Sequence, residues 1–118
     1  MANQNRGAVA LEAGDKVYSL RFSTNAICEL EEYLGGKPIM AIVKELEDES
    51  RVGMGLVRAI VWAALREDHK ELSPKEAGSI LDEAGQQIVM EKIGLALQRF
   101  FPDGEASDKP RPQKAKAG

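Results

Sequence analysis

The sequence predicts an α+β domain that is mostly α, with an N-terminal β-hairpin followed by about five helices in a compact bundle. Two patterns indicate this fold: apolar residues alternate with period two near the N-terminus and then recur at helical spacing. A chain of 118 residues suffices for one domain but not for two. We therefore assign residues 1–6 to a disordered N-terminus, 7–102 to the domain and 103–118 to a disordered basic tail rich in Pro and Lys.

Two extended segments, Ala8–Glu12 and Lys16–Ser23, open the domain and are separated by Ala13-Gly14-Asp15. The Gly-Asp pair between two alternating segments is typical of a β-hairpin turn. Val17 is the one apolar residue that breaks the alternation of the second segment. Its remaining apolar residues share one face: Tyr18, Leu20 and Phe22.

A first helix is expected to start at Ser23, Thr24 or Asn25, each of which can cap it with a side-chain oxygen. Gly35-Gly36 supplies the left-handed residues that commonly end a helix, and Pro38 suits the first position of a second helix. The apolar stripe of the first helix consists of Ile27, Leu30 and Leu34. That of the second consists of Ile39, Ile42, Val43 and Leu46.

A third helix is predicted from Arg51 to Glu67, with Ser50 as its cap, and it is apolar on almost every side. A helix without a polar face belongs in the middle of a bundle. Its small residues lie four apart and allow a neighbouring backbone to approach, either within the domain or in a partner: Gly55, Ala59 and Ala63.

Ser73-Pro74-Lys75-Glu76 is a capping box with proline at the first helical position, so a fourth helix begins there and Gly85 ends it. The last helix covers about Gln86 to Phe101. Residues expected inside are Ala77, Ile80, Leu81 and Ala84 of the fourth helix and Val89, Ile93, Ala96, Leu97 and Phe100 of the last.

The charge distribution argues against nucleic acid as a partner. The net charge is −3, and acidic residues outnumber basic ones in the first half of the chain. The longest apolar stretch, Val52 to Leu65, contains Arg58 and is shorter than the roughly twenty residues that span a bilayer. No apolar segment typical of a secretory signal follows Met1, so we expect a cytoplasmic protein without membrane contact.

The sequence offers little catalytic chemistry, and we expect no enzyme activity, cofactor or metal. Cys28 has no basic neighbour in sequence, which favours a buried or half-buried inert thiol. His69, the only histidine, lies in a charged connector and is interpreted as a solvated loop residue. Gly35-Gly36-Lys37 could attract an anion at a helix N-terminus, but it lacks the rest of a phosphate-binding motif and also fits a helix boundary.

The hairpin itself points to association with another chain. A two-stranded sheet leaves unpaired N–H and C=O groups on both of its edges, and we expect helices to cover one face without filling both edges. The segment Val9–Ser23 is therefore predicted to pair with another chain, either as a strand added to a partner or in a homo-oligomer.

Several stretches resemble the small tail proteins of gene transfer agents and related phages. These are Gly7-Ala8-Val9-Ala10-Leu11, Tyr18 to Glu31, Ala59 to Arg66 and Leu72 to Gly85, and the resemblance covers about Arg6 to Phe101. The family is grouped with phage tail assembly chaperones, although the name tail tube protein has also been given to it. Its members have no catalytic residues to transfer.

The resemblance implies that the chain binds the tape measure protein during tail assembly and keeps its aggregation-prone helical surface covered until the tube polymerises. A structural virion component, such as a tail tube or connector subunit, is the alternative, and a small helical DNA-binding regulator is a more distant one. The expected partner-binding residues lie on the hairpin and first helix, with core packing as their other interpretation: Tyr18, Leu20, Phe22, Ile27, Leu30 and Leu34.

Overall fold

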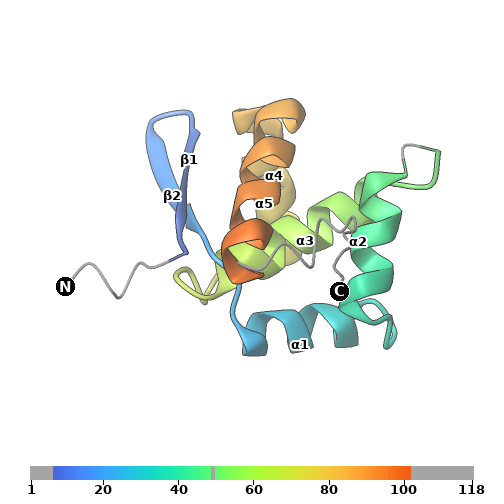
Figure 1. Cartoon of the computed structure of the whole chain (residues 1–118). Helices are drawn as coiled ribbons and strands as arrows, with labels where there is room; N and C mark the ends of the chain where they lie inside the picture. Colours follow the sequence, from blue (N-terminus) through green and yellow to red (C-terminus); the bar gives the residue numbers. More distant parts are fainter. Residues whose placement is uncertain (1–6, 49, 102–118) are drawn as a thin grey trace.

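A two-stranded hairpin packs against a bundle of five helices in the computed structural model, which describes residues 7–48 and 50–101 (Figure 1). The predicted fold class is confirmed. The elements are β1 (Val9–Ala13), β2 (Lys16–Leu20), α1 (Thr24–Tyr33), α2 (Ile39–Glu47), α3 (Met54–Arg66), α4 (Pro74–Ala84) and α5 (Gln86–Phe100). The N-terminus and basic tail predicted as disordered, residues 1–6 and 103–118, lie outside the described residues.

The hairpin is antiparallel, with Ala13 opposite Lys16 next to the turn and Val9 opposite Leu20 at the far end. Gly14 has φ +63°, a conformation that favours glycine, which explains its place in the two-residue turn. Along β1 every second side chain is buried, as predicted, and the buried ones rest on the helices. β2 ends at Leu20, earlier than predicted, although Phe22 beyond it is still buried in the core.

A side-chain cap begins α1, and two glycines and a proline connect this helix to α2. Ser23 caps α1 by accepting a hydrogen bond from the Ala26 N–H, as predicted. Gly35 and Gly36 follow α1 with positive φ angles of 78° and 93°. Pro38 is the N-cap of α2, one residue before the position predicted for it. The apolar stripe of α2 is buried at its centre and partly buried at its ends.

α3 lies at the centre of the fold and packs against α1, α4, α5 and β2, as its apolar sequence predicts (Figure 1). It starts at Met54 after Gly53, so Ser50 is not its cap. The Ser50 hydroxyl instead donates a 2.7 Å hydrogen bond to Asp48, which holds residues 50–52 in a turn. From Ala59 to Leu65 every side chain is buried. No helix of the described residues is long and apolar enough to cross a membrane.

The capping box at the start of α4 forms as predicted. The Ser73 hydroxyl accepts from the Glu76 N–H at 3.1 Å, and the Glu76 carboxylate accepts from the Ser73 N–H at 2.9 Å. Gly85, with φ +98°, ends α4 and begins α5 directly, which lets the two helices fold back on each other. Of the residues predicted inside α4 and α5, Ala84 and Phe100 are only partly buried.

Replacing the capping hydroxyl with Ser73→Ala should destabilise the domain by about 1 kcal/mol, because the Glu76 N–H at the start of α4 loses its acceptor. Urea unfolding followed by circular dichroism measures this loss. Ser79→Ala, at an exposed position within the same helix, serves as the control and should change stability by less than about 0.5 kcal/mol. Equal effects of the two substitutions would contradict a capping role for Ser73.

Candidate interaction surface

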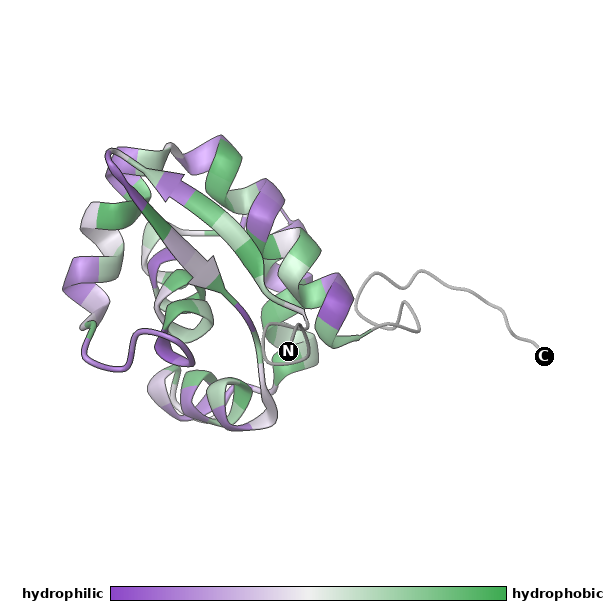
Figure 2. Ribbon diagram, turned by 90° about the vertical axis from the view of Figure 1, so that its left-hand side faces the viewer, coloured by the Kyte–Doolittle hydropathy of each residue, from purple (hydrophilic) through white to green (hydrophobic). Residues whose placement is uncertain are grey.

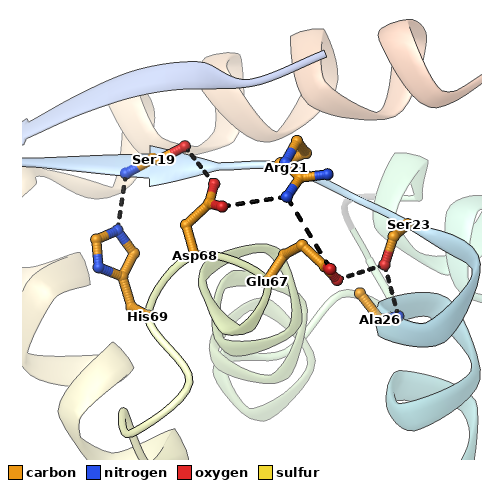
Figure 3. A network of polar contacts seen from close by, with 7 residues as sticks. All are labelled: Ser19, Arg21, Ser23, Ala26, Glu67, Asp68 and His69. Atoms are coloured by element: carbon orange, nitrogen blue, oxygen red, sulfur yellow. Dashed lines mark hydrogen bonds and ion pairs between the residues drawn. The ribbon is translucent and has the colours of Figure 1, made fainter. Parts of the chain in front are cut away.

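The outward edge of β2 is closed by the end of α3. The Ser19 N–H donates to His69 Nε2 at 3.1 Å, and the Arg21 N–H donates to the Ala64 carbonyl at 2.9 Å (Figure 3). The last carbonyls of a helix have no partner within it, and neither do the outward amides of an edge strand. The hydrogen bond from Arg21 to Ala64 therefore pairs an outward N–H at the end of β2 with a carbonyl that the last turn of α3 leaves free.

Side chains reinforce this junction on the exposed side. Arg21 Nη2 lies 3.1 Å from Asp68 Oδ1, and the Ser19 hydroxyl donates to Asp68 Oδ2 at 2.7 Å (Figure 3). The Ser23 hydroxyl, which also caps α1, donates to the Glu67 carboxylate. β2, α1 and the end of α3 are thus joined through one continuous polar network.

The pKa of Asp68 lies below its ordinary value of 3.8. Partial burial disfavours the charged form, but the hydrogen bonds from Arg21 and Ser19, together with the charges of Arg21 and His69, outweigh that effect. The ionised carboxylate is therefore the form that the junction stabilises.

His69 is not the solvated loop residue that the sequence suggested. It is partly buried, accepts the Ser19 amide, and meets the Tyr18 ring edge-on at a centroid distance of 5.4 Å. The Nε2 atom of the imidazole is the acceptor in this contact. The Ser19–His69 contact joins residues fifty positions apart, so the local sequence around His69 does not predict it.

The prediction that helices do not fill both edges of the hairpin agrees with the described residues, because the end of α3 closes the β2 edge and part of the β1 edge stays open. In an antiparallel ladder successive residues point their backbone groups alternately toward and away from the partner strand. Because Ser19 and Arg21 point outward on β2, the register places Ala10 and Glu12 outward on β1. Among the described residues, the backbone groups of Ala10 and Glu12 have no hydrogen-bond partner outside the hairpin. An open strand edge therefore remains on β1.

The six residues predicted to bind a partner lie mostly inside the protein. Four of them belong to the buried core: Leu20, Phe22, Ile27 and Leu30. Tyr18 and Leu34 are partly buried and pack against the same core. Core packing, the other interpretation of these six residues, accounts for the four buried side chains. Contact with a partner stays a prediction for Tyr18 and Leu34, whose side chains are only partly buried.

Cys28 is exposed, which corrects the prediction of a buried or half-buried thiol. Although it follows the buried Ile27 on α1, the helical rotation turns it away from the apolar stripe. It lines a shallow groove of about 330 Å³ between α1 and the end of α3, whose other walls include Glu29 and Arg66. Arg66 Nε lies 3.0 Å from Glu29 Oε1, and its guanidinium lies over the Trp62 ring, so these two groups are already engaged.

The start of α2 is occupied by a carboxylate of the chain itself. Glu31 Oε2 accepts a 2.7 Å hydrogen bond from the Ile39 N–H, in the first turn of the helix. Lys37 pairs with Glu45 at 2.7 Å, so the cation of Gly35-Gly36-Lys37 also has an internal partner. Gly35-Gly36-Lys37 is therefore a helix boundary. The Ile39 N–H that follows it is bound by Glu31 of α1, and the Lys37 cation is paired with Glu45 of α2.

A second groove, of about 400 Å³, runs between α3 and α4 and is lined by residues that include Met54, Gly55, Arg58 and Lys75. The Arg58 side chain crosses α4 over Gly78, where an added Cβ would lie 3.1 Å from Arg58 Cδ. Of the predicted strip of small residues, Ala59 and Ala63 are fully buried within the domain, whereas Gly55 is exposed. The described part of the chain holds no group of three or more potential metal ligands.

Two exposed apolar side chains on α5 were not among the residues singled out from the sequence. Ile88 and Leu95 are 47% and 41% exposed, although the predicted stripe of this helix included neither. They are seven residues apart and therefore share one side of the helix, next to the face that carries the buried Val89 and Ile93. A helical projection of residues 86–100 would have shown this second apolar row.

Comparison with known proteins finds no matching family model, no matching curated protein and no matching solved structure. The resemblance to tail assembly chaperones therefore rests on the sequence stretches described above.

The substitution Asp68→Asn should destabilise the protein by about 1 kcal/mol at neutral pH, because the ionised carboxylate holds Arg21 and Ser19. Since the folded-state pKa lies below 3.8, the contribution is present above that pH and is lost as the pH falls through the folded-state pKa. Urea unfolding of both proteins from pH 7 to pH 2 should show their stabilities converging in acid.

Asp82→Asn on α4 is the matched control, since it removes an exposed carboxylate outside the junction. Its stability should track that of the natural protein at every pH. A difference between natural protein and Asp68→Asn that persists unchanged into acid would contradict the assigned role of the Asp68 charge.

Proposed function

We propose that the protein is a non-enzymatic tail assembly chaperone that binds the tape measure protein during the assembly of a phage or gene transfer agent tail. The observation that carries the proposal is the open edge of β1, because an unpaired strand edge offers backbone donors and acceptors to a second polypeptide. The sequence resemblance supplies the identity of the client. Binding takes place in the host cytoplasm while particles are being assembled.

The shape of the surface supports polypeptide binding in two further ways. The hairpin is fixed to the bundle by the β2 junction, so the β1 edge is presented on a rigid support. Exposed apolar side chains on α5 add the kind of surface to which an aggregation-prone client binds. These features provide binding energy without any requirement for a metal or cofactor.

Co-expression with the tape measure protein of the same phage or gene transfer agent should keep that protein soluble and should yield a complex of the two on affinity purification. The reason is that the chaperone covers client surface that otherwise self-associates. The measurement is the soluble fraction of the tape measure protein with and without the chain, and we expect an increase of roughly tenfold, because complex formation withdraws free client from self-association by mass action.

An unrelated long coiled-coil protein serves as the control client and should gain no solubility from the chain. If the tape measure protein is equally soluble alone, or if no complex is recovered, the proposed function is wrong.

A structural virion component, such as a tail tube or connector subunit, is the second candidate. The open β1 edge is compatible with it as well, since pairing of two β1 edges joins two copies of the chain. Mass spectrometry of purified mature particles separates the two functions. A chaperone should be absent from them, whereas a tube subunit should be among their abundant proteins.

A further inference from the structure

The helix α2 is attached to the core by apolar side chains. Ile42 and Val43 are buried in the core, and Ile39 and Leu46 pack against it near the two ends of the helix. Within residues 7–48 and 50–101, no hydrogen bond or ion pair joins α2 to the hairpin, α3, α4 or α5. The attachment therefore depends on the burial of one narrow stripe.

The polar side-chain contacts of α2 reach residues that lie close to it in the chain. Glu31, eight residues before Ile39, accepts the Ile39 N–H at the first turn. Glu45 pairs with Lys37 at 2.7 Å and with Arg51 at 3.8 Å. Both ion pairs lie within the α2 segment and its immediate flanks, so they move with the helix and do not hold it on the core.

The other helices have attachments that α2 lacks. Arg66 of α3 pairs with Glu29 of α1 at 3.0 Å, and Arg99 joins α5 to β1. The backbone of α4 packs closely on α3, where the Arg58 side chain lies over Gly78. The backbone of α2 approaches the other elements less closely than that of any other helix, and α2 lies at the end of the bundle away from the hairpin (Figure 1).

Glycines flank the segment on both sides. Gly35 and Gly36 precede α2 with positive φ angles, and Gly53 follows it. A Cβ built on any of these three residues would meet no other group within 4 Å. Backbone rotation at these positions therefore meets little steric resistance, and they can serve as hinges.

We propose that α2 is a hinged cover, which opens as a unit while the hairpin, α1, α3, α4 and α5 stay folded. A segment held by few buried contacts opens at a lower free energy than the core, and it does so cooperatively. Opening separates Ile42 and Val43 from the core beneath them, so two apolar surfaces become accessible in the open form only. This motion does not depend on the proposed function.

Native-state amide hydrogen exchange in increasing urea tests the hinged cover. The Ile42 N–H, which donates to the Pro38 carbonyl at 3.0 Å, reports on α2, and the Ile60 N–H reports on α3. The α2 amides should exchange at least roughly tenfold faster than those of α3. Their exchange should also depend less on urea, because opening a nine-residue helix exposes less surface than unfolding the whole domain.

Two substitutions separate the opening of α2 from global unfolding. The Ser73 cap stays formed when α2 alone is open, so Ser73→Ala should speed the exchange of α3 amides roughly fivefold and leave α2 amides unchanged. Val43→Ala on α2 is the matched variant. It removes contacts that are lost in both kinds of opening, so it should speed exchange in α2 and α3 by the same factor.

Two kinds of result would overturn the hinged cover. Equal urea dependence of the α2 and α3 amides, or equal acceleration of both by Ser73→Ala, would mean that α2 opens only with the whole domain. Exchange that is independent of urea and rises smoothly toward the ends of α2 would mean fraying of single turns. The urea dependence of the natural protein decides the question if Val43→Ala does not fold. Failure to bind the tape measure protein would overturn the proposed function and leave the hinged cover intact.

Discussion

The junction between β2 and the end of α3 is the contact on which the rest of the surface depends. A two-stranded hairpin is marginal by itself, and it becomes part of the domain here because its outward amides meet acceptors at a helix end. The Ala64 carbonyl and the His69 imidazole supply those acceptors, and both positions are set by α3. Since α3 is buried on almost every side along its second half, the Ala64 carbonyl is held by a helix packed in the core, and His69 lies just beyond the end of that helix.

The two edges of the hairpin differ, because the end of α3 closes the β2 edge and not the β1 edge. β2 lies between β1 and the end of α3, so its backbone groups are satisfied on both sides at Ser19 and Arg21. Within residues 7–48 and 50–101, β1 is paired with a strand on one side, and Arg99 of the neighbouring helix α5 donates to the Ala8 carbonyl at the start of the other edge. The asymmetry follows from chain order: β2 continues directly into α1 across the end of α3, whereas β1 is the first element of the domain.

Local patterns predicted most of the fold and little of this surface. The alternation of β1, the Ser73 capping box and the two glycines after α1 are short-range signals, and each fixed its element correctly. The start of α3 was misplaced because Asp48 competes for the Ser50 hydroxyl, and nothing in the capping pattern reveals that competition. Contacts between distant residues, such as the one from Ser19 to His69, have no counterpart in local sequence.

The difference between short-range patterns and contacts of distant residues also explains why the residues first expected to bind a partner are mostly core residues. Period-two and helical patterns identify side chains that avoid water, and within one domain those side chains pack against each other before they can reach a partner. Leu20 and Leu30 are fully buried for this reason. What remains for a partner is what the domain cannot satisfy internally: backbone groups at Ala10 and Glu12 and apolar side chains such as Ile88 on the exposed side of α5.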